Sequence, residues 1–144
     1  MKSVHKTAIL GYSAEKMYAL VEDIAKYPEF LPWCAKTLIE HDDRDHTILA
    51  TLVIDFHGIR NSFTTRNHNT AFKTITMHLE KGPFNHLDGK WTFTPLPDGR
   101  SRIDLEMNYE FSNTLLEKLL APVFEMVSVT LVDSFCQRAK TVYG

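Results

Sequence analysis

Cysteine is scarce in this chain of 144 residues, which contains only Cys34 and Cys136. No CxxC pair and no spacing typical of a zinc site occurs. We expect two buried free thiols in a reducing compartment, and a single disulfide between them is the alternative.

The chain also lacks a strong charge of either sign and a long apolar run. Its formal net charge is −2, whereas a dedicated nucleic-acid binder is usually basic, so DNA is not expected as a partner. No uninterrupted run approaches the roughly 18 apolar residues of a membrane span. The first segment, MKSVHKTAILGYSAEK, has no long apolar core and carries an early Glu15. Because it resembles neither a signal peptide nor a transit peptide, we expect a cytoplasmic protein.

Motifs that carry catalysis or bind a metal are missing too: the chain has no HExxH, GxSxG, P-loop or GxGxxG. His41 and His46 flank DDRD, a segment typical of a solvated turn rather than of a metal site. His57 shares a strand face with Asp55, which is compatible with a base oriented by a carboxylate. The end of a surface hairpin is the simpler interpretation. We expect no catalytic residue, no metal and no required cofactor.

The first quarter of the chain predicts a strand followed by a helix. Residues 3–10 suit a strand that ends at Gly11, and Ser13 suits a helix N-cap. The helix has apolar residues at helical spacing, namely Met17, Leu20, Val21 and Ile24. It is expected to end before Tyr27 and Pro28, since a residue before proline disfavours helical backbone.

From about residue 35 the apolar period changes to two, which predicts about six consecutive antiparallel strands with one solvated face. The alternation is clearest in TILATLVIDF at 47–56 and RIDLEMNYEF at 102–111, and it is also present in KTITMHLEK at 73–81 and KWTFTPL at 90–96. Turn residues separate these segments at 57–58, 67–69, 81–83 and 97–99.

Helical spacing returns from Thr114 to the C-terminus. Thr114 and Glu117 fit a capping box, and Pro122 is expected to kink or break this helix near its start. The element order indicates one α+β domain over residues 1–144, in which a curved antiparallel sheet of about seven strands wraps around the long C-terminal helix. The space between sheet and helix is the candidate site. Its aromatic residues either fill a core or line a cavity, as in many ligand pockets.

Four segments carry a family resemblance: YPEFLPWC at 27–34, SFTTRN at 62–67, GPFNHLDGKWTF at 82–93 and YEFSNTLLEKLLAPVF at 109–124. Together they resemble the bacterial branch of the coenzyme Q-binding START-like family, over nearly the whole chain. The resemblance implies the helix-grip fold, also called START-like or Bet v 1-like, which agrees with the element order.

The resemblance implies three functions. Mitochondrial relatives are associated with ubiquinone binding and respiration, so ubiquinone is the first expected ligand, bound without catalysis. Other members are labelled ribosome association toxins, which implies binding to the large ribosomal subunit and a block of subunit joining. An older label, oligoketide or polyketide cyclase, implies an enzyme. The strands place mostly apolar groups inward, so the cyclase is the least favoured of the three.

The segment YPEFLPWC suggests where a ligand enters. In the implied fold, Tyr27, Phe30, Leu31 and Trp33 form an apolar lip at the cavity mouth, suited to a ligand that arrives from a membrane surface. The alternative is a proline-rich loop folded over the edge of the core. The remaining candidate ligand contacts lie on strands and on the C-terminal helix: Asn61, Phe63, Trp91, Phe93, Val123, Phe124, Val127 and Leu131.

A possible ribosome contact is the strand face that carries Arg60, Ser62, Thr64 and Arg66, with Lys73 expected on the next strand. Such a basic patch predicts salt-sensitive binding to RNA. The alternative is an ordinary solvated sheet face, which the acidic net charge favours.

Overall fold

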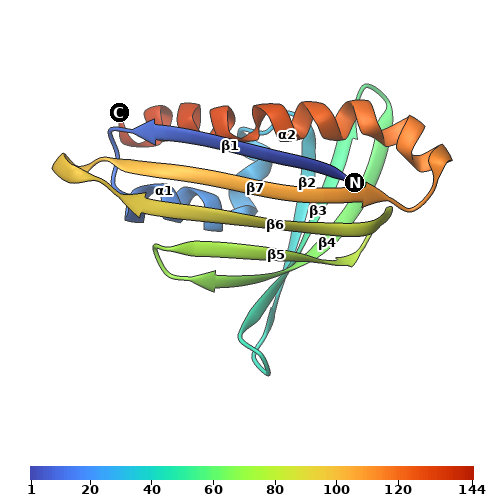
Figure 1. The fold of residues 1–144 in the computed structure, drawn as a ribbon, viewed down its shortest axis with the longest axis horizontal. Coiled ribbons are helices and arrows are strands. Elements are labelled where there is room, and N and C mark those ends of the chain that lie inside the picture. Colours follow the sequence, from blue (N-terminus) through green and yellow to red (C-terminus); the bar gives the residue numbers. More distant parts are fainter.

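The computed structural model describes residues 1–144 and contains a seven-stranded sheet and two α-helices (Figure 1). All neighbouring strands are antiparallel, in the order β1-β7-β6-β5-β4-β3-β2. The strands are β1 Lys2–Leu10, β2 Cys34–Asp42, β3 Thr47–Phe56, β4 Ile59–Thr70, β5 Thr74–Lys81, β6 Phe84–Pro95 and β7 Ser101–Phe111. The first strand, the six-strand meander and the final helix confirm the predicted α+β helix-grip architecture.

The first helix, α1 (Ala14–Glu22), begins as predicted, because the Ser13 side chain accepts a hydrogen bond from the backbone N–H of Lys16. It ends earlier than predicted. Ile24 belongs to the separate 3₁₀-helix η1 (Ile24–Glu29), which also contains Tyr27 and Pro28. Pro28 is tolerated there because its ring supplies a suitable φ and its missing N–H leaves only one backbone bond unmade. α1 therefore ends before Tyr27 and Pro28, as predicted, but Ile24 lies outside it.

The turn predicted at residues 67–69 was wrong, because these residues lie inside β4. Asn67 pairs with Ile48 of β3 and Met77 of β5, and its side chain is buried. The tertiary pairing on both sides overrides the turn preference of asparagine. The chain reverses instead at residues 71–73, so Lys73 lies in the β4–β5 turn and not on β5. The turns at His57-Gly58, Gly82-Pro83 and Pro97–Gly99 are confirmed.

The long helix α2 (Thr114–Tyr143) is capped by Asn113, whose side chain accepts from the N–H of Leu116, and not by Thr114 as predicted. Pro122 does not break the helix, although Figure 1 shows the first turns inclined to the rest. By length and composition alone α2 is apolar enough to cross a membrane, with a mean hydropathy of 1.6 over its most apolar window. The core helix of a helix-grip fold has the same character, and the buried face of α2 packs against the sheet.

The core lies between the inner face of the sheet and a cover made by two helices, not by α2 alone. Phe135 of α2 contacts the Trp91 ring of β6, and Tyr18 of α1 contacts Phe93 of the same strand. Figure 1 shows α1 near one end of the sheet and α2 extending along its length, so both helices contribute to the cover.

Candidate functional site

An apolar cavity of about 80 Å³ lies between the sheet and the helices, and 17 of its 23 lining residues are hydrophobic. Strands β3 to β7 supply its floor, and α1, η1 and α2 supply its walls. Of the twelve predicted ligand contacts, seven line this cavity: Tyr27, Trp33, Phe63, Trp91, Phe124, Val127 and Leu131. The predicted site between sheet and C-terminal helix therefore exists as a real cavity.

The other five predicted contacts lie elsewhere. Asn61 and Val123 border a separate pocket of about 10 Å³, and Phe30 borders an open surface depression beside α2. Leu31 is fully buried and does not line this cavity. Phe93 faces inward, but Tyr18 of α1 packs on its ring and separates it from the cavity. The packing of the helices on the sheet therefore determines which inward-facing side chains line the cavity.

The polar side of the cavity comes from three residues that the sequence analysis did not single out. Thr65, Asn67 and Asn69 occupy alternate positions on the inner face of β4, and we call them the polar row. The Thr65 hydroxyl donates to Oδ1 of Asn67 over 2.7 Å, while Oδ1 of Asn69 is buried without a hydrogen-bond partner. The sequence analysis missed this row because it assigned residues 67–69 to a turn. Period-two spacing continued from Phe63 along the strand would have placed all three side chains on the inner face.

The Trp33 side chain provides a second polar group in the cavity lining. It is 2% exposed, and its indole Nε1–H has no hydrogen-bond partner. A buried indole N–H usually finds an acceptor. The cavity lining therefore carries one unsatisfied donor, on Trp33, and one unsatisfied acceptor, on Asn69, in otherwise apolar surroundings.

The segment YPEFLPWC closes the core and does not form the predicted exposed lip. Tyr27, Leu31 and Trp33 are 8%, 0% and 2% exposed. The Tyr27 hydroxyl donates to the carbonyl of Val21, its ring meets Phe135 edge-on, and burial raises its pKa above the ordinary value. Only Phe30 is half-buried, under the guanidinium of Arg138. The alternative interpretation, a loop folded over the core edge, describes this segment.

The Asp88 carboxylate, at the cavity lining, is already engaged in hydrogen bonds. Burial acts to raise the pKa of Asp88, but hydrogen bonds from Asn108 and His86 outweigh it and hold the pKa below its usual range. Cys34 and Cys136 are free thiols, and burial raises the pKa of both. No group of three or more His, Cys, Asp or Glu side chains is arranged to hold a metal ion.

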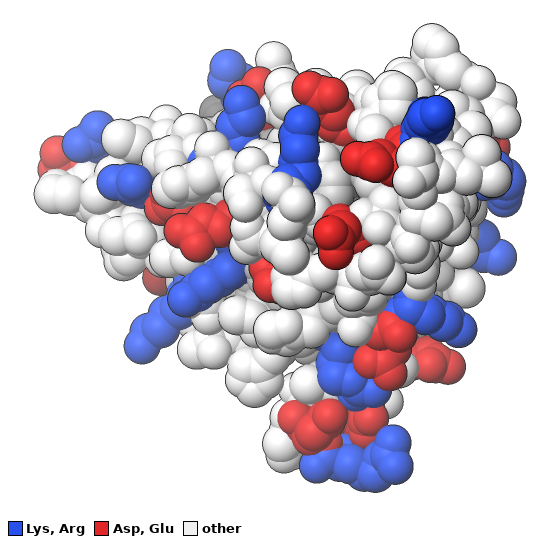
Figure 2. Space-filling view, turned by 45° about the vertical axis from the view of Figure 1, so that its right-hand side comes forward, with Lys and Arg blue, Asp and Glu red and all other residues white.

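The predicted basic residues do not come together. Arg60 lies near the start of β4, and Lys73 lies in the turn beyond its end, so about 33 Å of strand separates them. Arg60 is paired with Asp55 at 3.0 Å. Figure 2 shows lysine and arginine interspersed with aspartate and glutamate over the visible face, without a large basic area.

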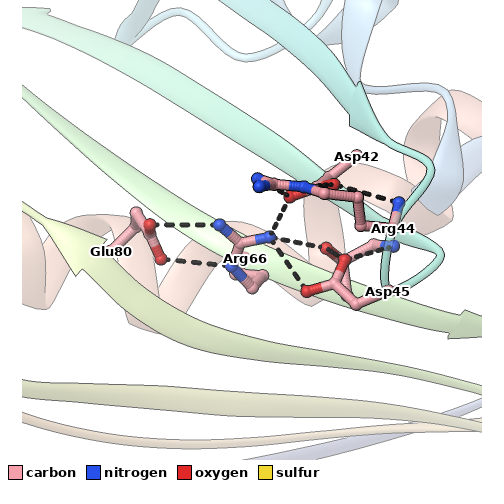
Figure 3. A network of polar contacts seen from close by, with 6 residues as sticks. Asp42, Arg44, Asp45, Arg66 and Glu80 are labelled. Atoms are coloured by element: carbon pink, nitrogen blue, oxygen red, sulfur yellow. Dashed lines mark hydrogen bonds and ion pairs between the residues drawn. The ribbon is translucent and has the colours of Figure 1, made fainter.

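Arg66 lies at the centre of an ion-pair network on the outer face of the sheet (Figure 3). Its guanidinium contacts Asp42 at 3.1 Å and Asp45 at 3.3 Å, both in the β2–β3 hairpin, and Glu80 of β5 at 3.1 Å. Arg44 also binds Asp42, and these contacts lower the Asp42 pKa to about 2. The network joins three strands and neutralises Arg66.

Comparison with known proteins places this geometry in a family. Residues 10–136 match the family model described as polyketide cyclase/dehydrase and lipid transport. The chain is 38% identical to ribosome association toxin RatA of Vibrio cholerae over 100% of its own length and 99% of that protein, and 40% identical to RatA of Escherichia coli over 100% and 90%. It is 27% identical to coenzyme Q-binding protein COQ10 homolog B of Xenopus laevis, over 96% of this chain and 58% of that protein.

Solved structures share the fold. An 18 kDa protein from Caulobacter crescentus superposes with a TM-score of 0.79 at 28% identity, covering 100% of this chain and 99% of that one. The Zhui aromatase/cyclase from a Streptomyces species superposes with a TM-score of 0.82 at 19% identity, covering 96% and 93%. The chain belongs to the START-like polyketide cyclase/dehydrase and lipid transport family, and within it to the group of RatA proteins.

Proposed function

We propose that this chain is a non-enzymatic binding protein that holds an isoprenoid quinone of the ubiquinone type in the cavity between sheet and α2. The observation that carries the proposal is the chemistry of the lining, in which an apolar surface contains an unsatisfied indole N–H and an unsatisfied amide oxygen. A quinone ring presents carbonyl oxygens to a donor, and its reduced form presents hydroxyls to an acceptor, while the tail requires only apolar contact. The Xenopus relative named as coenzyme Q-binding supports this ligand class.

Binding in this cavity requires the cover to move. A volume of about 80 Å³ is well below the roughly 300 Å³ of a typical ligand pocket. The helices α1 and α2 are the elements that can separate from the sheet without breaking its hydrogen-bonded ladders. We therefore expect quinone binding to change the contacts of these helices while the sheet stays intact.

The test is organic extraction of protein purified from a quinone-producing bacterium, followed by mass spectrometry. Ubiquinone in near-stoichiometric amount is expected. Trp33→Phe keeps an aromatic ring but removes the indole N–H, so affinity for a short-tailed ubiquinone is expected to fall by about tenfold, as for one lost hydrogen bond. Val129→Ala, on the exposed face of α2, is the control. Protein that contains no quinone, and whose tryptophan fluorescence does not respond to added quinone, would contradict the proposal.

The second candidate function is binding to the large ribosomal subunit, in the cytoplasm. The observation that favours it is the full-length match to proteins named ribosome association toxin RatA. Co-sedimentation with ribosomes over a range of salt concentrations tests this candidate, because phosphate contacts weaken as salt rises. If Arg60 and Arg66 belong to the contact, Arg60→Gln with Arg66→Gln abolishes co-sedimentation. A melting curve accompanies the measurement, because Arg66 also pairs with Asp42, Asp45 and Glu80. Unchanged sedimentation would remove these two residues from the contact.

A cyclase activity is the least supported candidate. The ionisable side chains of the lining are Glu22, Tyr27 and Asp88, of which Tyr27 and Asp88 are held by internal hydrogen bonds. Turnover of a polyketide that is lost on Asp88→Asn would support a cyclase activity.

The quinone proposal includes a transient contact with the membrane surface, because a quinone of this type resides in the membrane.

A further inference from the structure

The lining of the cavity shows where it meets solvent. Of the 23 lining residues, only Glu22 has an exposed side chain, and the others are buried or half-buried. Glu22 is the last residue of α1. The cavity therefore approaches the surface beside the C-terminal end of α1.

The opposite side of this opening is the β4–β5 turn. The ring of Phe72, in that turn, meets the ring of Tyr18 of α1 edge-on, with centroids 5.6 Å apart. Burial raises the pKa of Tyr18, the nearby Glu22 carboxylate raises it further, and the Asn69 side chain lowers it. Tyr18, Glu22, Asn69 and Phe72 therefore surround one small region, and Figure 1 shows the turn at the same end of the sheet as α1.

Phe72 has two features that an ordinary turn residue lacks. Its side chain is 50% exposed although it is a large aromatic group, and its φ is +65°. A bulky residue in the left-handed region is rare, because its Cβ crowds the backbone. The Tyr18 ring is the only aromatic partner of Phe72, and Tyr18 lies beside Glu22 and Asn69 of the cavity lining.

We propose that ligands enter the cavity between α1 and the β4–β5 turn, and that the Phe72 ring closes this entrance against Tyr18. The segment YPEFLPWC, which begins in η1 just after the C-terminal end of α1, is then a permanent seal, in agreement with the burial of Tyr27, Leu31 and Trp33. The nature of the ligand rests on the proposed function, but the position of the entrance does not.

The fluorescence of the two tryptophans can show whether a small molecule enters the cavity, and this test needs no bound ligand. Trp33 and Trp91 are its only tryptophans, both line the cavity, and they are 2% and 3% exposed. Acrylamide, a small neutral quencher, reaches them only through an open entrance. Phe72→Ala removes the ring that contacts Tyr18, so the quenching constant is expected to rise by about two- to tenfold, the equivalent of one lost edge-to-face aromatic pair.

Two matched variants complete the experiment. Phe72→Tyr keeps the aromatic edge contact and is expected to be quenched like the unmodified protein. Phe30→Ala removes a ring from YPEFLPWC, the alternative entrance, and is expected to leave quenching unchanged because the buried residues of that segment keep it closed. Melting temperatures within a few degrees of the unmodified protein exclude general unfolding as the cause. Unchanged quenching in Phe72→Ala, or a larger rise in Phe30→Ala, would overturn the proposed entrance.

A stopped-flow measurement with short-tailed ubiquinone separates this inference from the proposed function. If both hold, Phe72→Ala raises the association and dissociation rates by a similar factor and leaves the Kd nearly unchanged. If the unmodified protein does not bind the quinone but Phe72→Ala raises acrylamide quenching, the quinone proposal fails and the entrance stands. If binding occurs with rates that Phe72→Ala does not change, the entrance is overturned and the quinone proposal stands.

Discussion

The hydroxyl of Thr65 donates a hydrogen bond to Oδ1 of Asn67 over 2.7 Å, between two buried side chains on the inner face of β4. The bond fixes the orientation of the Asn67 amide inside a mostly apolar cavity. Its neighbour on the same face, Asn69, has no such partner for its oxygen. The Asn67 amide is therefore oriented by a hydrogen bond within the protein, whereas the side-chain oxygen of Asn69 remains without a donor.

Thr65→Val tests this bond as a source of stability. The substitution keeps the shape of the side chain but leaves the buried Asn67 oxygen without its donor, so the free energy of unfolding is expected to fall by about 1–3 kcal/mol. Urea denaturation measures the change. The double variant Thr65→Val with Asn67→Leu removes both partners and is expected to recover part of the loss. A double variant less stable than the sum of the two single variants would contradict this account.

Gly89→Ala is expected to reduce ligand binding at little cost in stability. A Cβ at Gly89 would lie 2.7 Å from Cε of Met77, the flexible end of a side chain that can swing away. Both residues line the cavity, so the added methyl group and the displaced Met77 occupy space that a ligand needs. Titration with short-tailed ubiquinone and a thermal melt check the two halves of this prediction. Equal affinity for both proteins would show that the ligand does not occupy this part of the cavity.

Gly82→Ala is the contrasting case. Its φ is +154°, and a Cβ there would lie 2.8 Å from Cβ of Phe63 and 3.3 Å from its Cα. These atoms cannot move without shifting β4, so a loss of about 1–3 kcal/mol in the free energy of unfolding is expected. Denaturation of the two alanine variants side by side measures the difference. A Gly82→Ala protein as stable as Gly89→Ala would show that the strand adapts more easily than its geometry suggests.

The Arg44–Asp42–Arg66 contacts predict a specific acid response. The Asp42 pKa falls from 3.8 to about 2 in the folded protein, first because of Arg44 and then because of Arg66. A lowered folded-state pKa means that the charged form stabilises the fold above pH 3.8. This contribution is lost as the pH falls through the interval from about 4 to about 2. Melting temperatures measured over this interval should fall less steeply for Asp42→Asn than for the unmodified protein.

Asp43→Asn is the matched control, since Asp43 is exposed in the same hairpin and takes part in none of these ion pairs. Its melting curve over the same interval is expected to follow the unmodified protein. A parallel fall in all three proteins would show that Asp42 does not contribute to the acid response.

The two thiols are expected to be free and slow to react. Burial raises the pKa of Cys34 and Cys136, which lowers the fraction of reactive thiolate at neutral pH. Alkylation by iodoacetamide should therefore be slow in the native protein and complete after unfolding without a reductant. Fewer than two thiols after unfolding would indicate a disulfide, which the structure does not contain.

The sequence by itself determined the order and type of the elements, because hydrophobic periodicity is a local property. Alternation in TILATLVIDF and RIDLEMNYEF predicted β3 and β7, and three- and four-residue spacing predicted α2. Side-chain direction on a strand follows from parity, so the inward position of Trp91 and Phe93 was predictable as well.

Only the tertiary structure decided which inward residues line the cavity. Trp91 and Phe93 are two positions apart on one strand face, yet the Tyr18 ring covers Phe93 and leaves Trp91 at the cavity. Asn67 and Asn69 favour a turn locally, but ladder hydrogen bonds on β4 outweigh that preference. Both outcomes depend on contacts between segments far apart in the chain, and such contacts leave no trace in local periodicity.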